Sequence, residues 1–134
     1  MEQMQSPTMA VIGLGIIGLL LSLSYAMRGA KVIGLDVLPS LVDDINRGIT
    51  HHMETYEGRT IRDILQEQLN SGRFRATTDY AAVAREVDTY VVTVGIPIQD
   101  GAPDFSALDS SCRSLAAVLK RGDTVLIRST VVRG

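Results

Sequence analysis

Three glycines near the N-terminus have the spacing of a phosphate-binding turn. Gly13, Gly15 and Gly18 form the pattern G-x-G-x-x-G. In such a turn the first glycine permits a tight bend, the second lets a pyrophosphate approach the backbone, and the third lets a helix pack closely on a strand. The helix that follows offers unpaired N–H groups and a partial positive charge to the phosphate oxygens. The spacing therefore points to binding of nucleotide phosphates without a lysine.

An acidic residue follows at the distance expected for the other half of such a site. Asp36 comes 18 residues after Gly18, and the pattern has an acid about 20 residues further on. A carboxylate here accepts hydrogen bonds from ribose hydroxyls and repels a 2′-phosphate. The next residues, Val37 and Leu38, supply no arginine to reverse that preference. We therefore expect dinucleotide binding, with NAD favoured over NADP.

These residues can act together only if a strand precedes the glycines and a helix follows them. Thr8–Gly13 predicts a short buried strand, residues 16–30 predict a helix that ends in Arg and Gly, and Lys31–Asp36 predicts a second strand. The alternatives are structural: the glycines form a packing turn, and Asp36 caps the next helix. The strand–turn–helix context favours dinucleotide binding.

The rest of the chain continues the alternation of strands and helices. Its predicted strands are continuous apolar runs, which indicates burial on both faces of a parallel sheet. We expect an α/β fold of the Rossmann type, doubly wound and mostly parallel, with helices on both faces. Residues 1–7 are expected to be a disordered leader, and residues 8–134 a partial NAD-binding domain that is truncated at the C-terminus. The predicted helices are 39–47, 60–69, 80–86 and 105–120, the strands 74–77, 89–94 and 124–127, and the loops 51–58 and 95–103.

Composition excludes several other classes of protein. The chain has 134 residues, enough for one domain, and 46% hydrophobic residues argue against disorder. A net charge of −2 gives no basic field for nucleic acid. A single cysteine excludes a disulfide framework and fits a reducing, cytoplasmic setting. Residues 3–27 lack charge, but three glycines interrupt them and no basic residue precedes them, which argues against a signal peptide or membrane span.

Other chemistry-bearing side chains have simpler explanations. Cys112 lies in the middle of a predicted helix, where a half-buried thiol is expected. His51 and His52 are adjacent in a predicted loop, and no cluster of further ligands accompanies them. We therefore expect no metal site and no catalytic residue in this chain.

The motifs resemble those of the UDP-glucose/GDP-mannose dehydrogenase family over residues 9–132. Within that family, Asn46–Gly48, His51 or His52, Glu54 and Arg113–Ala116 look most like the UDP-N-acetylmannosamine dehydrogenase branch. The segments that carry the family resemblance are Val11–Leu19, Leu35-Asp36, Val42–Gly48, Arg73–Asp79, Pro103-Asp104 and Ser129–Val131.

The resemblance implies an enzyme that oxidises the C6 alcohol of a UDP-sugar to a carboxylate in two NAD-dependent steps, as a homo-oligomer. The family's catalytic lysine, asparagine and cysteine match nothing here, so this chain alone is expected to bind NAD without turnover. The sequence departs from the family pattern at Ile16, Leu41, Ile96 and Arg128. The residues expected to contact NAD are Gly13, Gly15, Ile16, Ile17, Gly18, Asp36, Gly95, Pro97 and Thr130.

Two alternatives share the same opening fold. One is the NAD-binding domain of a β-hydroxyacid or 6-phosphogluconate type of dehydrogenase. Such relatives often carry Asn or Arg after the second strand to accept NADP, where this chain has Asp36 followed by Val37. The other is a non-enzymatic domain that senses NAD.

Overall fold

Five parallel strands form the central sheet of the chain. They lie in the order β5-β2-β1-β6-β9, so the chain starts in the middle and winds outward in both directions. This computed structural model describes residues 8–128 and 131–132; the predicted leader 1–7 and Thr130 lie outside the described residues. The strands are β1 (Thr8–Ile12), β2 (Lys31–Leu35), β5 (Phe74–Thr77), β6 (Thr89–Val92) and β9 (Thr124–Ile127).

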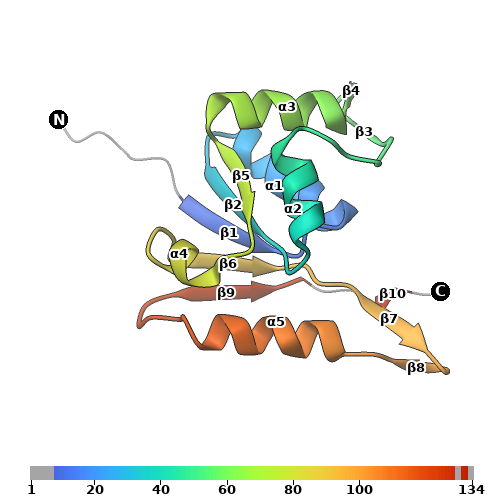
Figure 1. Ribbon diagram of the computed structural model, residues 1–134, viewed down its shortest axis with the longest axis vertical. Helices are drawn as coiled ribbons and strands as arrows, with labels where there is room; N and C mark the ends of the chain where they lie inside the picture. The colour runs from blue at the N-terminus through green and yellow to red at the C-terminus, as the bar shows by residue number, and fades with distance from the viewer. Residues whose placement is uncertain (1–7, 129–130, 133–134) are drawn as a thin grey trace.

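Helices cover both faces of this sheet. Figure 1 shows the sheet between α3 at the top and α5 at the bottom. One apolar cluster joins the first three helices to one face, and a second cluster joins α4 and α5 to the other. The helices are α1 (Ile16–Met27), α2 (Pro39–Asn46), α3 (Ile61–Ser71), α4 (Tyr80–Ala84) and α5 (Ser106–Ala116).

Alternating residues of each strand enter the two apolar clusters. Val11 packs toward α1, whereas its neighbours Ala10 and Ile12 pack toward α4 and α5. Successive side chains of a strand point to opposite faces, so a strand that is buried on both sides must be apolar throughout. The continuous apolar runs of the sequence have this physical cause, and the predicted Rossmann-type fold is confirmed.

The two predicted loops were wrong, because each contains a small hairpin. Residues 51–58 include β3 (Thr55–Tyr56), which pairs with β4 (Arg59–Thr60). Residues 95–103 include β7 (Ile96–Gln99) and β8 (Ala102–Pro103), and β7 also pairs with β10 (Val131–Val132). Each hairpin turns through a non-glycine residue followed by glycine, both with positive φ: Glu57-Gly58 and Asp100-Gly101.

Two positive φ angles in a row define the type I′ turn, whose twist matches that of paired strands. The Asp100-Gly101 pair is a standard sequence signal for this turn. The strands of the two hairpins are only two to four residues long, which is too short to show an alternating pattern. The last predicted helix is also shorter than expected, ending at Ala116 rather than at residue 120.

Helix α1 accounts for much of the uncharged stretch near the N-terminus. It is 12 residues long and is followed by Gly29 in the left-handed region, with a φ of 100°. None of the helices in the described part of the chain is long and apolar enough to cross a membrane.

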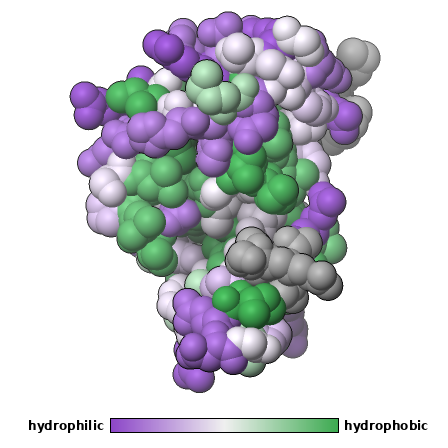
Figure 2. All heavy atoms as spheres, turned by 90° about the vertical axis from the view of Figure 1, so that its right-hand side faces the viewer, coloured by the Kyte–Doolittle hydropathy of each residue, from purple (hydrophilic) through white to green (hydrophobic). Residues whose placement is uncertain are grey.

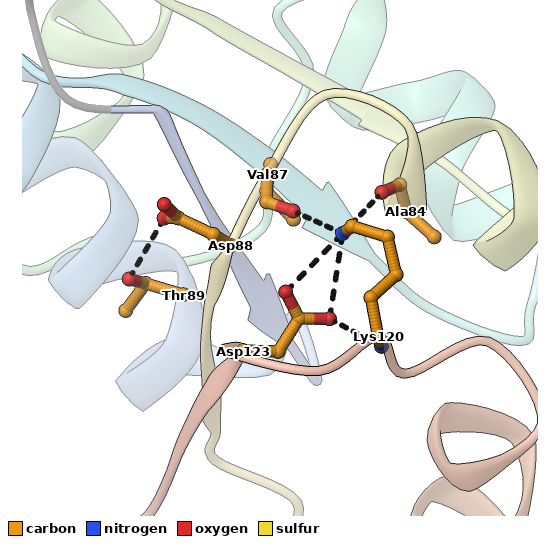
Figure 3. A network of polar contacts seen from close by, with 6 residues as sticks. All are labelled: Ala84, Val87, Asp88, Thr89, Lys120 and Asp123. Atoms are coloured by element: carbon orange, nitrogen blue, oxygen red, sulfur yellow. Dashed lines mark hydrogen bonds and ion pairs between the residues drawn. The ribbon is translucent and has the colours of Figure 1, made fainter.

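Lys120 connects three segments by hydrogen bonds and an ion pair at the amino end of the sheet, away from the glycine turn. Its Nζ donates to the carbonyl oxygens of Ala84 at 2.9 Å and Val87 at 3.1 Å, and to Asp123 Oδ1 at 3.2 Å (Figure 3). The side chain of Asp123 is only 3% exposed, and its Oδ2 accepts from the Lys120 backbone N–H at 2.8 Å. That backbone bond and the Lys120 ammonium hold the pKa of Asp123 below its usual range. The network ties the end of α4 and the start of β6 to the start of β9.

We expect Lys120→Met to destabilise the protein by about 1–2 kcal/mol, because the carbonyls of Ala84 and Val87 lose the ammonium donor and the Asp123 carboxylate keeps only the backbone N–H of residue 120. Methionine keeps most of the length of the stem, so the change isolates the charge. Urea unfolding measures the difference, with Lys31→Met as the control, since Lys31 is exposed at the start of β2. Equal unfolding midpoints for the two variants would show that the network contributes nothing.

Candidate functional site

A cleft of about 490 Å³ opens at the carboxyl edge of the sheet, where β1, β2 and β6 end. The chain leaves β1 toward β2 on one side and returns to β6 on the other, and ligands of open α/β folds bind at such a reversal of strand order. Figure 2 looks onto this edge and shows hydrophobic side chains across its middle, between hydrophilic ends. Eight of the nine predicted NAD contacts line the cleft: Gly13, Gly15, Ile16, Ile17, Gly18, Asp36, Gly95 and Pro97.

The first and third glycines are required by close packing of the backbone. Gly13 has a φ of 97°, in the region that favours glycine. A Cβ on Gly18 would lie 1.7 Å from the carbonyl oxygen of Gly13 and 2.6 Å from Thr93 Oγ1. Helix α1 therefore starts directly against the turn, and any side chain on Gly18 would displace it.

Thr93 holds this turn in place and was missed by the sequence analysis. Its hydroxyl donates to the carbonyl oxygens of Gly13 at 2.9 Å and Ile12 at 3.1 Å. The residue follows β6 directly and is 9% exposed. The only sequence signal for this role is a hydroxyl residue at the end of an apolar strand. That signal does not identify the partner, because Gly13 lies 80 residues earlier in the chain.

The second glycine leaves an open space above the start of α1. Gly15 has an ordinary φ of −68°, and a Cβ there would meet nothing within 4 Å. No side chain caps this helix, and its first internal hydrogen bond runs from Leu19 N–H to Gly15 O at 2.9 Å. The N–H groups of Ile16, Ile17 and Gly18 thus precede the helical ladder and are available to an anion in the cleft.

Asp36 contacts the glycine turn and the start of the next helix, and the second contact is the structural role that the sequence left open. Its Oδ2 accepts from Leu14 N–H at 2.9 Å, and its Oδ1 accepts from Leu38 N–H at 3.2 Å. Leu38 is the N-cap residue of α2, so the carboxylate holds both the glycine turn and the start of the next helix. A carboxylate has about four acceptor positions, so roughly two remain for a ligand in the cleft.

The opposite wall comes from helices that the sequence analysis did not connect with the site. Gly95 and Pro97 follow β6 as predicted, and Tyr80 of α4 joins Ala107 and Ser111 of α5 beside them. Burial raises the pKa of the Tyr80 phenol, and the nearby Asp36 carboxylate adds to this effect. The wall is therefore mainly apolar, with two hydroxyl groups.

The remaining chemistry-bearing residues lie outside the cleft. Cys112 is half-buried, as predicted, and does not line the cleft. His51 is exposed, while His52 Nδ1 lies 4.0 Å from a carboxylate oxygen of Glu54. Within residues 8–128 and 131–132, no three metal-ligating side chains gather.

The sequence matches a known protein family over nearly its whole length. The model of the UDP-glucose/GDP-mannose dehydrogenase family, NAD binding domain, matches residues 7–134. UDP-N-acetyl-D-mannosamine dehydrogenase of Salmonella typhi is 37% identical over 128 residues, which cover 95% of this chain and 29% of that protein.

Two solved structures share the arrangement of strands and helices. The UDP-D-ManNAc dehydrogenase of Pyrococcus horikoshii aligns with a TM-score of 0.83 and 32% identity, over 92% of this chain and 28% of that one. The GDP-mannose dehydrogenase of Pseudomonas aeruginosa, solved as a ternary complex, aligns with a TM-score of 0.81 and 29% identity, with the same coverage. The chain thus spans less than a third of the length of these relatives.

Proposed function

Since this chain belongs to the UDP-glucose/GDP-mannose dehydrogenase family and matches its NAD-binding domain, we propose that the cleft at the carboxyl edge of the sheet binds NAD. The observation that carries this proposal is the open position of Gly15 beside uncapped N–H groups of α1, with Asp36 at the end of the neighbouring strand. A pyrophosphate fits the first feature, and a ribose diol fits the second.

Different residues of the cleft contact different parts of NAD. The N–H groups of Ile16, Ile17 and Gly18 bind the phosphate oxygens, and Asp36 accepts from the ribose hydroxyls. Gly95, Pro97 and Thr130 belong to segments that follow the next strands, and we assign them to the nicotinamide half. NAD, once bound, accepts a hydride from the substrate. Ile96 replaces the threonine of the family pattern and is 6% exposed, so it serves packing rather than hydrogen bonding.

We further propose that the parent enzyme oxidises the C6 alcohol of a UDP-sugar to the carboxylate in two NAD-dependent steps. The Salmonella and Pyrococcus relatives act on UDP-N-acetylmannosamine by name, which supports that branch. The sugar-binding and catalytic groups match nothing in these residues, so the chain by itself is expected to bind NAD and to leave the sugar unchanged. A cytoplasmic, homo-oligomeric enzyme remains a prediction from the sequence.

Calorimetric titration with NAD and NADP tests the cofactor assignment. We expect NAD to bind and NADP to bind at least tenfold more weakly, because Asp36 repels the 2′-phosphate. In Asp36→Asn, NAD affinity should fall about tenfold through loss of charge-assisted hydrogen bonds, and the preference over NADP should shrink. Asparagine keeps one oxygen for Leu14 N–H, so the turn retains its main contact.

Asp43→Asn is the matched control for that experiment. Asp43 is exposed on α2 and lies outside the cleft, so the variant removes the same charge without touching the site. It should bind both dinucleotides as the parent does. Absence of NAD binding by the parent would overturn the assignment, and equal losses in both variants would remove the specific role of Asp36.

A further inference from the structure

We propose that Thr93 positions Asp36 for the ribose of NAD, and that it does so through the peptide group that joins Gly13 to Leu14. This inference rests on the proposed binding of NAD and goes beyond it. It gives the Thr93 hydroxyl an effect on ribose binding, and therefore on the preference for NAD over NADP, in addition to its contact with the glycine turn.

One peptide group of the glycine turn is held at both of its ends by side chains. Its carbonyl, from Gly13, accepts from the Thr93 hydroxyl at 2.9 Å. Its N–H, from Leu14, donates to Asp36 Oδ2 at 2.9 Å. Thr93 directly follows β6 and Asp36 directly follows β2, and β1 lies between these two strands. The peptide at the end of β1 therefore links two side chains that do not touch the same strand.

The Gly13 carbonyl depends on this hydroxyl for its hydrogen bond. The Thr93 hydroxyl also donates to the carbonyl oxygen of Ile12 at 3.1 Å, but that oxygen already accepts from the Thr93 main-chain N–H at 2.8 Å. In the described part of the chain, no main-chain N–H donates to the Gly13 carbonyl. Glycine restricts its own backbone torsions only weakly, so hydrogen bonds have a large part in fixing the plane of this peptide.

The plane of this peptide affects how Asp36 meets a ribose. A chain of hydrogen bonds runs from the Thr93 hydroxyl through the peptide to Asp36 Oδ2, and the members of such a chain polarise one another. Without the hydroxyl, the peptide is free to tilt, and the Leu14 N–H holds the carboxylate less firmly. Binding must then include the ordering of the carboxylate, which lowers the affinity.

Thr93→Val tests the proposal because valine keeps the shape of threonine and removes the hydroxyl. We expect the affinity for NAD to fall about three- to tenfold. The affinity for NADP should fall less, because a loosened Asp36 also repels the 2′-phosphate less, so the preference for NAD shrinks. A residue that only stabilises the turn would lower both affinities by the same factor. Calorimetric titration measures them, and circular dichroism checks that each variant is folded.

A double-mutant cycle with Asp36→Ala tests the route through the carboxylate. In that background Thr93→Val should lower the NAD affinity by less than about twofold, because the group on which the hydroxyl acts is gone. The cycle needs the parent, both single variants and the double variant. Fully additive losses would show that Thr93 acts on NAD binding independently of Asp36.

Thr93→Ser and Thr89→Val complete the experiment. Serine restores the hydroxyl, so Thr93→Ser should recover most of the NAD affinity and of the NAD preference that valine loses. Thr89 begins the same strand, and its hydroxyl bonds to Asp88 Oδ1 outside the cleft. Thr89→Val is therefore the matched control, and it should bind both dinucleotides as the parent does.

A parent that fails to bind NAD refutes the proposed function itself. If the parent binds NAD, the role of Thr93 is overturned by unchanged affinity in Thr93→Val, by equal losses of NAD and NADP affinity, or by additivity in the cycle. If valine prevents folding, Thr93→Ser decides: a folded serine variant that keeps the NAD preference supports the proposal, and one that loses it contradicts the proposal.

Discussion

Gly18→Ala is expected to leave the protein largely unfolded at room temperature, although alanine is the better helix former. Helix propensity alone favours alanine by about 1 kcal/mol. Against this, the new Cβ would lie 1.7 Å from the Gly13 carbonyl oxygen, so α1 must move by more than about 1 Å. Thr93 Oγ1, which holds the Gly13 carbonyl, would itself lie 2.6 Å from the new Cβ, so the turn has little room to yield. We expect a loss of about 4 kcal/mol or more, close to the whole stability of many small domains.

Far-ultraviolet circular dichroism during urea titration measures this loss directly. The unfolding midpoint of Gly18→Ala should fall close to zero denaturant, with or without NAD. The sign of the change in stability is itself informative. Helix propensity predicts that alanine stabilises the protein, whereas the contact with the Gly13 carbonyl predicts that it destabilises the protein. A variant at least as stable as the parent would mean that α1 does not pack against the glycine turn as described.

Gly15→Ala is expected to fold normally and to lose NAD binding. Its φ is accessible to alanine, and the Cβ would enter open space in the cleft. Loss of glycine at the helix boundary costs only about 0.5–1 kcal/mol. The methyl group would occupy the position where the pyrophosphate must contact the N–H groups of α1. We expect the NAD affinity to fall at least tenfold, measured by calorimetry.

Gly58→Ala is the control that separates binding from stability. Gly58 lies in the turn between β3 and β4 with a φ of 78°, and it is not part of the cleft. Alanine there should cost about 1 kcal/mol of stability through backbone strain and leave NAD affinity unchanged. Opposite behaviour of the two variants would link affinity to the space above Gly15. Full NAD affinity in Gly15→Ala would place the pyrophosphate elsewhere.

Much of this fold was predictable from local patterns. Apolar runs of four or five residues predicted buried parallel strands, because alternate side chains of one strand serve two opposite faces of the sheet. The glycine spacing predicted the turn after β1, because the constraints on Gly13 and Gly18 arise within a few residues of each other. Asp36 was found at its spacing because one helix and one strand span a nearly constant number of residues.

Other features depend on which distant segments the fold brings together. Thr93 reaches Gly13 only because β6 pairs with β1 rather than with β5, its neighbour in the sequence. Tyr80 and Ser111 meet in the cleft because α4 and α5 share one face of the sheet. The two hairpins formed where strands of two to four residues are too short to give a periodic signal.

The sequence by itself therefore determined the fold class, the glycine turn and the acid that follows it. These depend on backbone sterics and on side-chain periodicity over short stretches of chain. The tertiary structure alone decided what forms the far wall of the cleft, which side chain holds the turn in place, and which of the three glycines is free to face a ligand. Those features depend on contacts between residues far apart in the chain, for which no local pattern exists.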